Sequence, residues 1–273
     1  MIRRLMWLLL IPVLAYLAIL AFLYFNQAAM LFPVGQVAPA GPVPANAERL
    51  ALTAASGERL AGLHIPPATA SDNGLLVLGF GGNAWNGDAM ANYLHDLYPQ
   101  AHVVAFHYRG YGPSEGSPDA DALREDAVRV HDFARERLRP ARVIAVGFSI
   151  GSGVAASLAA QRRLDGLILV TPFDSLGRVA AGHYRWLPVR LLFRHRFDPA
   201  EDLVGQPAPV AIIAGERDTL VPPARTEALR RATPDLVFDR TIAGVGHNDI
   251  YDRTEFRDAM ADALARLETP PRR

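Results

Sequence analysis

One serine in this chain occupies a position from which it could act as a nucleophile. In Arg142–Gly153, RVIAVGFSIGSG, branched apolar residues lead to Ser149 and small, helix-compatible residues follow it. This order predicts a strand, a sharp turn and a helix, with Ser149 at the apex of the turn. A turn this tight strains its central residue and leaves no room for a Cβ two residues to either side, which explains Gly147 and Gly151. The turn would expose the Ser149 hydroxyl and leave the N–H of Ile150 free to bind a developing oxyanion.

The same Gly-x-Ser-x-Gly pattern occurs a second time, at Gly112–Gly116. No helix-forming residue directly follows Ser114, and Pro113 fixes its own φ and restricts the residue before it. We therefore interpret this copy as a loop and Ser149 as the candidate nucleophile.

A serine hydroxyl needs a base to take its proton and an acid to orient that base. Asp218 follows the apolar run Val210–Ala214, and His247 lies in a glycine-rich loop after Leu236–Ile242. We predict that His247 is the general base and Asp218 its acid. An ordinary loop histidine is the alternative for His247. A structural loop residue is the alternative for Asp218, with the acid supplied instead by Glu216 or Asp249.

A second oxyanion donor is expected in the loop after an earlier central strand. The apolar run Leu75–Phe80 ends in Gly81-Gly82-Asn83, so the backbone N–H of Asn83 is the candidate. The alternative is that Asn83 is only a turn residue.

Strands and helices alternate along the part of the chain that carries these residues. After a predicted hairpin within residues 48–65, the expected strands are Leu75–Phe80, Val103–Tyr108, Arg142–Phe148, Gly166–Val170, Val210–Ala214 and Leu236–Ile242. The expected helices are Gly87–Leu97, Ala120–Leu138, Ile150–Arg163, Pro223–Ala232 and Thr254–Leu267. This alternation indicates an α/β fold with a mostly parallel sheet covered on both faces, in which sites form at the carboxyl ends of strands.

Composition excludes several kinds of chemistry. The chain has 273 residues, 50% of them hydrophobic, which suffices for one large domain and an appendage. It contains no cysteine and no lysine, so thiol catalysis, disulfides and Schiff-base lysines are excluded. The formal net charge is zero, which gives no electrostatic reason to expect a nucleic-acid partner.

The N-terminus predicts a membrane anchor. Leu5–Phe25 is an uninterrupted apolar run that would form a helix roughly 31 Å long, enough to cross the hydrocarbon core of a bilayer. A cleaved signal peptide, with secretion of the remainder, is the alternative, although Asn26 and Gln27 fit poorly at a cleavage site. Arg3 and Arg4 favour a single-pass protein with a cytoplasmic N-terminus and an extracytoplasmic domain.

These features divide the chain into segments. We predict an anchor over residues 1–25, a Pro/Gly/Ala-rich linker over 26–47 that holds the domain away from the membrane, and a catalytic domain over 48–268. Within that domain, residues 174–205 interrupt the alternation and are predicted to fold over the site as a cap. Residues 269–273 form a short tail.

Six motifs together resemble one family. They are FGGNAWN (80–86), FHYRGYGPSEGSP (106–118), GFSIGSG (147–153), TPFDSL (171–176), AGERDTLVP (214–222) and GVGHND (244–249). Over residues 48–267 the chain resembles the α/β hydrolases, in particular their membrane-anchored ABHD-type branch, which carries an N-terminal span and a small cap. In two places the chain departs from that pattern: Gly81 stands where relatives usually have His, and His107 where they often have Asp.

The resemblance implies a serine hydrolase that transfers an acyl group to water through an acyl-enzyme and requires no metal and no cofactor. The implied substrate is a small-molecule or lipid acyl compound, that is, an ester, a thioester or a lysophospholipid. Activity is expected to be lost in acid, because a protonated His247 cannot act as a base. A serine peptidase of the same fold, and a non-catalytic membrane-tethered interaction protein, are the alternatives.

The centre of the predicted cap, residues 183–197, mixes apolar residues with four arginines and two histidines. One interpretation is a cap that packs its apolar side on the domain and leaves its charges in solvent. The other is a surface that contacts anionic lipid and admits an acyl chain from the membrane.

Overall fold

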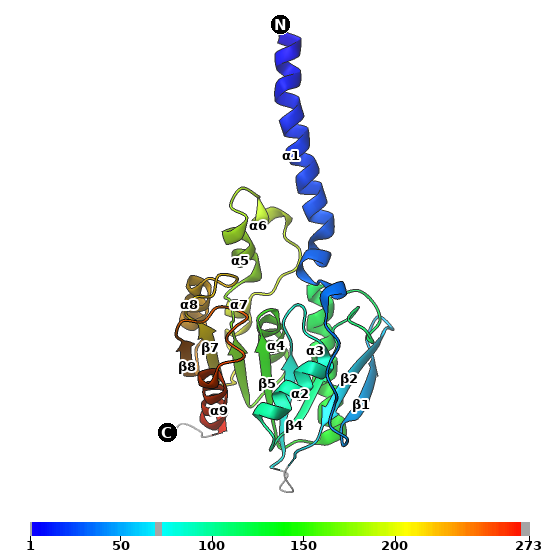
Figure 1. The fold of residues 1–273 in the computed structure, drawn as a ribbon, viewed down its shortest axis with the longest axis vertical. Coiled ribbons are helices and arrows are strands. Elements are labelled where there is room, and N and C mark those ends of the chain that lie inside the picture. The colour runs from blue at the N-terminus through cyan, green and yellow to red at the C-terminus, as the bar shows by residue number, and fades with distance from the viewer. Residues whose placement is uncertain (1, 69–72, 269–273) are drawn as a thin grey trace.

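The computed structural model describes residues 2–68 and 73–268, with side chains described from Leu10 onward. The predicted tail, residues 269–273, lies outside the described residues. An eight-stranded sheet in the order β1-β2-β4-β3-β5-β6-β7-β8 forms the centre of the domain (Figure 1). The strands are β1 (Glu48–Thr53), β2 (Arg59–Ile65), β3 (Leu75–Phe80), β4 (His102–Phe106), β5 (Arg142–Phe148), β6 (Gly166–Val170), β7 (Val210–Gly215) and β8 (Leu236–Ile242).

The sheet is mostly parallel. β1 and β2 form the antiparallel hairpin expected at the start of the domain, β2 is antiparallel to β4, and all further neighbours are parallel. Every residue of β3, β6 and β7 is buried, which explains why these strands read as continuous apolar runs rather than as alternating patterns.

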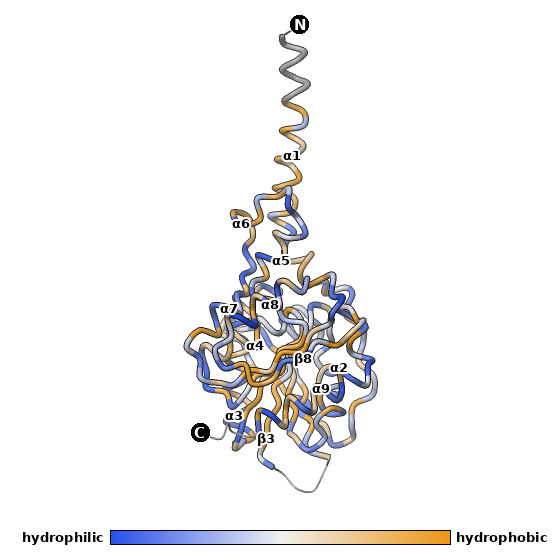
Figure 2. Tube along the Cα trace, turned by 90° about the vertical axis from the view of Figure 1, so that its left-hand side faces the viewer, coloured by the Kyte–Doolittle hydropathy of each residue, from blue (hydrophilic) through white to orange (hydrophobic). Residues whose placement is uncertain are grey.

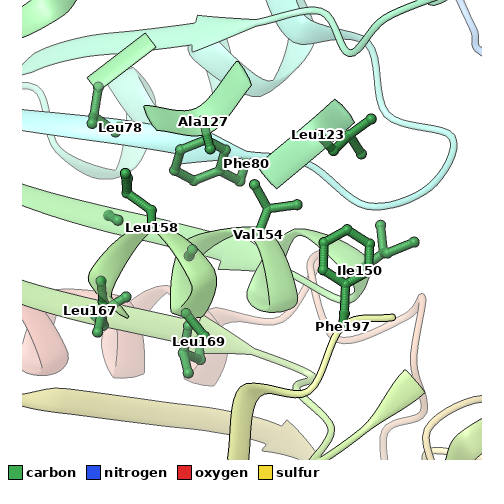
Figure 3. Close-up of a cluster of buried hydrophobic side chains, with 14 of the residues drawn as sticks. Leu78, Phe80, Leu123, Ala127, Ile150, Val154, Leu158, Leu167, Leu169 and Phe197 are labelled. Atoms are coloured by element: carbon green, nitrogen blue, oxygen red, sulfur yellow. The ribbon is translucent and has the colours of Figure 1, made fainter. Parts of the chain in front are cut away.

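Helices cover both faces of the sheet and divide its core into two clusters. α2 (Gly87–Leu97) and α9 (Thr254–Glu268) pack on one face. α3 (Ala120–Leu138), α4 (Ile150–Gln161) and α8 (Pro223–Ala232) pack on the other. Figure 3 shows the second cluster, in which Val154 and Leu158 of α4 lie between the sheet and α3. The predicted fold class is confirmed.

Most element boundaries agree with those expected from the sequence. β4 ends at Phe106 instead of Tyr108, because the backbone N–H of His107 already bonds to the carbonyl of Ala61 outside the ladder (2.9 Å). α4 ends at Gln161, two residues before the predicted Arg163, and Arg162 takes up an extended conformation.

The N-terminal helix α1 (Ile2–Leu31) stands away from the domain (Figure 1). The described segment Leu10–Gln36 is long and apolar enough to cross a membrane, and its most apolar window is not buried in the protein. Figure 2 shows that the described part of α1 is largely apolar.

The predicted linker differs from the expectation. Residues 26–31 are still helical, and Val34–Gln36 forms the short 3₁₀ helix η1. Phe32 is buried, with its ring 5.6 Å from the ring of His195, and Val43 and Ala47 pack against the core. The linker is therefore bound along the surface of the domain instead of acting as a spacer, since burying these apolar side chains stabilises the attached arrangement.

Three short helices lie between β6 and β7. They are α5 (Leu176–His183), α6 (Val189–Leu192) and α7 (Pro199–Asp202). α5 and α6 rise on the side of the domain from which α1 emerges, whereas α7 lies beside α4 and α8 (Figure 1). The three helices occupy the segment predicted as the cap, residues 174–205.

Candidate active site

Ser149 lies at the sharp turn between β5 and α4, with φ 52° and ψ −118°. This strained backbone is the one predicted for the apex of the turn. A Cβ at Gly147 would lie 2.3 Å from the carbonyl oxygen of Gly151, and a Cβ at Gly151 would lie 2.1 Å from that of Phe80. Only glycine fits at either position, so the turn depends on both.

The structure brings the three predicted side chains together. Ser149 Oγ lies 2.8 Å from His247 Nε2, and His247 Nδ1 lies 2.7 Å from Asp218 Oδ2. Asp218 and His247 come from loops after β7 and β8, at the carboxyl ends of their strands. Both are buried, with 5% and 8% of their surface exposed, so little water competes for these hydrogen bonds.

The second carboxylate oxygen of Asp218 is also held in place. Asp218 Oδ1 accepts hydrogen bonds from the backbone N–H groups of Leu220 (2.9 Å) and Val221 (2.7 Å). These two bonds orient the other oxygen toward His247.

Neither alternative acid is bonded to His247. Glu216 Oε2 accepts from the N–H of Gly244 (2.8 Å), and Asp249 Oδ1 accepts from the N–H of Gly246 (2.8 Å). Both carboxylates stabilise the loop that carries His247.

Asn83 and Ile150 line the same pocket as Ser149. Neither backbone N–H has a hydrogen-bond partner among residues 2–68 and 73–268. The N–H of Ile150 is free because Ile150 opens α4, where backbone donors have no partner in the preceding turn. Two unpaired donors beside a serine hydroxyl can stabilise an oxyanion.

Two tyrosines hold the Asn83 loop and were not singled out from the sequence. Tyr111 Oη donates to the carbonyl of Asn83, and Tyr108 Oη donates to the carbonyl of Gly81 (2.8 Å). At its far end the loop becomes α2 at Asn86, whose side chain caps the helix by accepting from the N–H of Asp88 (2.9 Å). Both tyrosines belong to the sequence FHYRGYG, so this motif was the signal in the sequence from which they could have been found.

The glycine at position 81, where relatives usually have histidine, lies beside an aromatic cluster. A Cβ there would lie 3.1 Å from Cβ of Trp85, whose ring contacts Tyr93, Phe148 and Tyr251. A side chain at position 81 would therefore require Trp85 to move by a few tenths of an ångström within this aromatic cluster.

His107 and Ser114 are structural. His107 is buried and its Nε2 lies 3.1 Å from Asp88 Oδ1, while the other carboxylate oxygen, Asp88 Oδ2, pairs with Arg49. Burial alone would raise the pKa of Asp88. The hydrogen bonds from His107 and Arg49 together lower this pKa by more than burial raises it, so the pKa of Asp88 lies below its usual value. Ser114 Oγ donates to the carbonyl of His107 (2.9 Å) and accepts from the N–H of Ala61 (2.9 Å).

A pocket of about 560 Å³ opens at Ser149. Its walls are mostly apolar and come from the cap and, unexpectedly, from α1. Within the part of the chain that the structure describes, no group of three His, Asp or Glu side chains is arranged to hold a metal ion.

Comparison with known proteins is consistent with this architecture. Residues 75–206 match the family model described as alpha/beta hydrolase fold. An uncharacterised protein of Mycobacterium tuberculosis is 34% identical over 95% of both chains. The chain belongs to the α/β-hydrolase family.

Relatives and solved structures extend the comparison. Lysophosphatidylserine lipase ABHD12 of Danio rerio is 31% identical over 60% of this chain, which spans about half (50%) of that relative's length. An esterase from Pyrococcus furiosus superposes with a TM-score of 0.66 and 18% identity, covering 82% of this chain and 91% of that one. A serine hydrolase without lid from Xanthomonas campestris superposes with a TM-score of 0.61 and 19% identity, covering 83% of this chain and 97% of that one. At these identities, the solved structures show the fold alone.

Proposed function

We propose that this α/β hydrolase is a membrane-anchored serine hydrolase that cleaves an acyl ester or thioester. The observation that carries the proposal is the hydrogen-bonded series from Ser149 Oγ through His247 to Asp218, which opens into an apolar pocket. Such a series activates the serine, because the imidazole can take the hydroxyl proton while the carboxylate orients the ring and stabilises its charged form.

Acylation follows from these distances. His247 Nε2 takes the proton of Ser149 as Oγ attacks the substrate carbonyl carbon, and the carbonyl oxygen becomes an oxyanion that accepts from the N–H groups of Asn83 and Ile150. When the tetrahedral intermediate collapses, the bond to the leaving alcohol or thiol breaks and His247 returns the proton to it. An acyl group remains on Ser149.

Deacylation repeats the sequence with water. His247 takes a proton from water as the water oxygen attacks the acyl carbon, and the second intermediate collapses with the proton returned to Ser149. The products are a carboxylic acid and the free enzyme. Protonation of His247 blocks both half-reactions, so activity is lost in acid.

The pocket favours an acyl-lipid substrate, such as a lysophospholipid, over a peptide. Most of its walls are aliphatic or aromatic side chains of α1 and of the cap, residues 174–205, and few polar groups are available to bind a peptide backbone. The name of the vertebrate relative, lysophosphatidylserine lipase, points to the same class.

We place the N-terminus in the cytoplasm and the domain on the opposite side of the membrane. Arg3 and Arg4 precede the apolar run, and the next basic residue after it is Arg49. Basic residues close to a span favour the cytoplasmic side.

The test uses the full chain in detergent micelles and p-nitrophenyl esters from acetate to palmitate, with Ser149→Ala as the control. Hydrolysis that is lost in the Ser149→Ala variant, together with fluorophosphonate labelling of the wild type only, supports the proposal. Labelling without ester hydrolysis would replace it with the peptidase alternative. Neither labelling nor hydrolysis would leave the non-catalytic alternative.

A further inference from the structure

The C-terminal half of α1 forms one wall of the pocket that ends at Ser149. The residues that line it share one helix face, at spacings of three and four, and are Leu20, Leu23, Tyr24, Gln27, Met30 and Leu31. The opposite walls come from α5 and α6. A helix that served only to tether the domain would not need to line this pocket.

Polar contacts fix α1 to the cap at a defined register. The side-chain amide of Gln27 donates from Nε2 to the carbonyl of Leu192 (2.8 Å), and its Oε1 accepts from the N–H of Arg194 (2.9 Å). The Arg194 guanidinium lies 4.8 Å from the ring centroid of Tyr24. Gln27 thus satisfies two backbone groups of the cap at once.

A contact nearer the N-terminus of α1 indicates how far the cap extends along this helix. Tyr16 Oη donates to the carbonyl of Trp186 (3.0 Å). Tyr16 lies nine residues before Phe25, about 13 Å along the helix. If Leu5–Phe25 spans the bilayer, the cap loop at Trp186 lies within the leaflet.

The tip of the cap has the surface expected for that position. Tyr184, Trp186 and Leu191 are 41%, 57% and 84% exposed. Exposed apolar and aromatic side chains beside an apolar helix are stabilised when hydrocarbon replaces the water around them.

We propose that α1 and the cap together form an acyl-chain channel that leads from the lipid leaflet to Ser149. An acyl lipid would enter from the membrane between α1 and α5–α6, place its chain along the Leu20–Leu31 face, and present its ester carbonyl to Ser149. The membrane helix is then a substrate-binding element that sets chain-length selectivity. This inference rests on the proposed hydrolysis at Ser149.

The test places a bulky side chain at successive depths of the channel. Leu23→Trp and Leu20→Trp narrow it from α1, whereas Phe22→Trp is the matched control, because Phe22 is 63% exposed and does not line the pocket. We measure kcat/KM for p-nitrophenyl esters from acetate to palmitate, with the full chain in micelles. The results are compared as the ratio of the palmitate value to the acetate value and as the longest acyl chain that each variant hydrolyses.

We expect Leu23→Trp to lower this ratio at least tenfold and Phe22→Trp to change it less than twofold. Leu20 is one helical turn farther from Ser149, roughly 4.5 Å. The longest chain that Leu20→Trp accepts should therefore exceed the longest that Leu23→Trp accepts. General damage to the fold would not produce this order, and fluorophosphonate labelling of each variant reports an intact Ser149 site.

The two proposals fail in different ways. If wild type shows no Ser149-dependent hydrolysis of either ester, the proposed function is wrong. If wild type hydrolyses both esters but the three tryptophan variants share one chain-length profile, the proposed function is supported and the proposed channel is wrong.

Discussion

At the scale of single residues, the site depends on how one carboxylate is held. Asp218 uses one oxygen to bind two backbone N–H groups and the other to bind His247. The carboxylate therefore positions the imidazole through bonds to its own loop, and it stabilises the positive charge that His247 acquires during the reaction.

Replacing Asp218 tests this arrangement. Asp218→Asn keeps the shape of the side chain but removes the negative charge and presents an amide to His247, which disfavours the productive tautomer. We expect kcat/KM for p-nitrophenyl butyrate to fall by about 10³ to 10⁴. Asp249→Asn is the matched control, since Asp249 bonds to the loop and not to His247, and it should reduce the rate far less. Equal losses in the two variants would contradict the role of Asp218.

Asp202, at the end of α7, titrates differently from a free aspartate. Burial raises its pKa to about 6, with Arg124 3.7 Å away lowering it only in part. Between about pH 4 and 6 the folded carboxyl keeps a proton that the unfolded chain releases, so the free energy of unfolding falls as pH rises through that window.

Asp202→Asn should remove this fall in the free energy of unfolding, because asparagine does not titrate. We expect the variant to gain up to about 3 kcal/mol over wild type at pH 8, because two pKa units correspond to roughly that energy, and to gain little at pH 4. Thermal unfolding of both proteins in micelles from pH 4 to 8 measures the difference, with the exposed Asp121→Asn as the control. A difference in Tm that does not vary with pH would contradict the titration of Asp202.

At the scale of elements, the cap has two unlike sides. One side lines the pocket at Ser149, and the other lines a groove of about 900 Å³ that contains Arg185, Arg190 and Arg196. These three arginines are exposed, and none forms an ion pair with a described residue. The two sequence interpretations of the cap are therefore compatible: apolar residues pack inward while free arginines remain available for anionic lipid.

The arginines should favour anionic membranes. We expect the triple variant Arg185→Gln, Arg190→Gln and Arg196→Gln to lose most of any rate increase that anionic vesicles give over neutral vesicles. Each basic residue near such a surface contributes about 1 kcal/mol. The assay is hydrolysis of a long-chain ester in vesicles with and without anionic lipid.

The matched control changes three exposed arginines at the opposite end of the sheet, Arg135, Arg139 and Arg163. If this control loses the anionic preference to the same extent, the effect comes from net charge and not from the cap.

At the scale of the whole molecule, α1, the linker and the cap act as one attachment. The linker is packed on the domain, and α1 is bonded to the cap, so the site is held at a fixed distance from α1. If α1 spans the membrane, as proposed, this arrangement orients the pocket mouth toward the bilayer.

The absence of cysteine allows a direct test of orientation. Asp121→Cys introduces one thiol on α3, at a side chain that is 89% exposed. In intact cells a membrane-impermeant maleimide should label this variant and leave the cysteine-free wild type unlabelled. Labelling only after the cells are lysed would place the domain in the cytoplasm.

The sequence by itself determined the alternating elements, the fold class, the turn at Ser149 and the candidates Asp218 and His247. These depend on local rules, because continuous apolar runs form buried parallel strands, and only glycine fits beside a strained turn. The order of strands then brings their carboxyl ends to one edge.

Only the tertiary structure decided which carboxylate reaches His247, what packs beside Gly81, and which residues of α1 line the pocket. Glu216, Asp218 and Asp249 are all carboxylates in loops that follow a strand. Only the hydrogen bonds of the folded loops show that Asp218 bonds to His247, whereas Glu216 and Asp249 bond to backbone N–H groups. The wall that α1 contributes depends on contacts between residues more than 160 positions apart, such as Gln27 with Leu192. Hydrophobic periodicity contains no information on such pairings, since an apolar helix face appears the same whether lipid or a cap covers it.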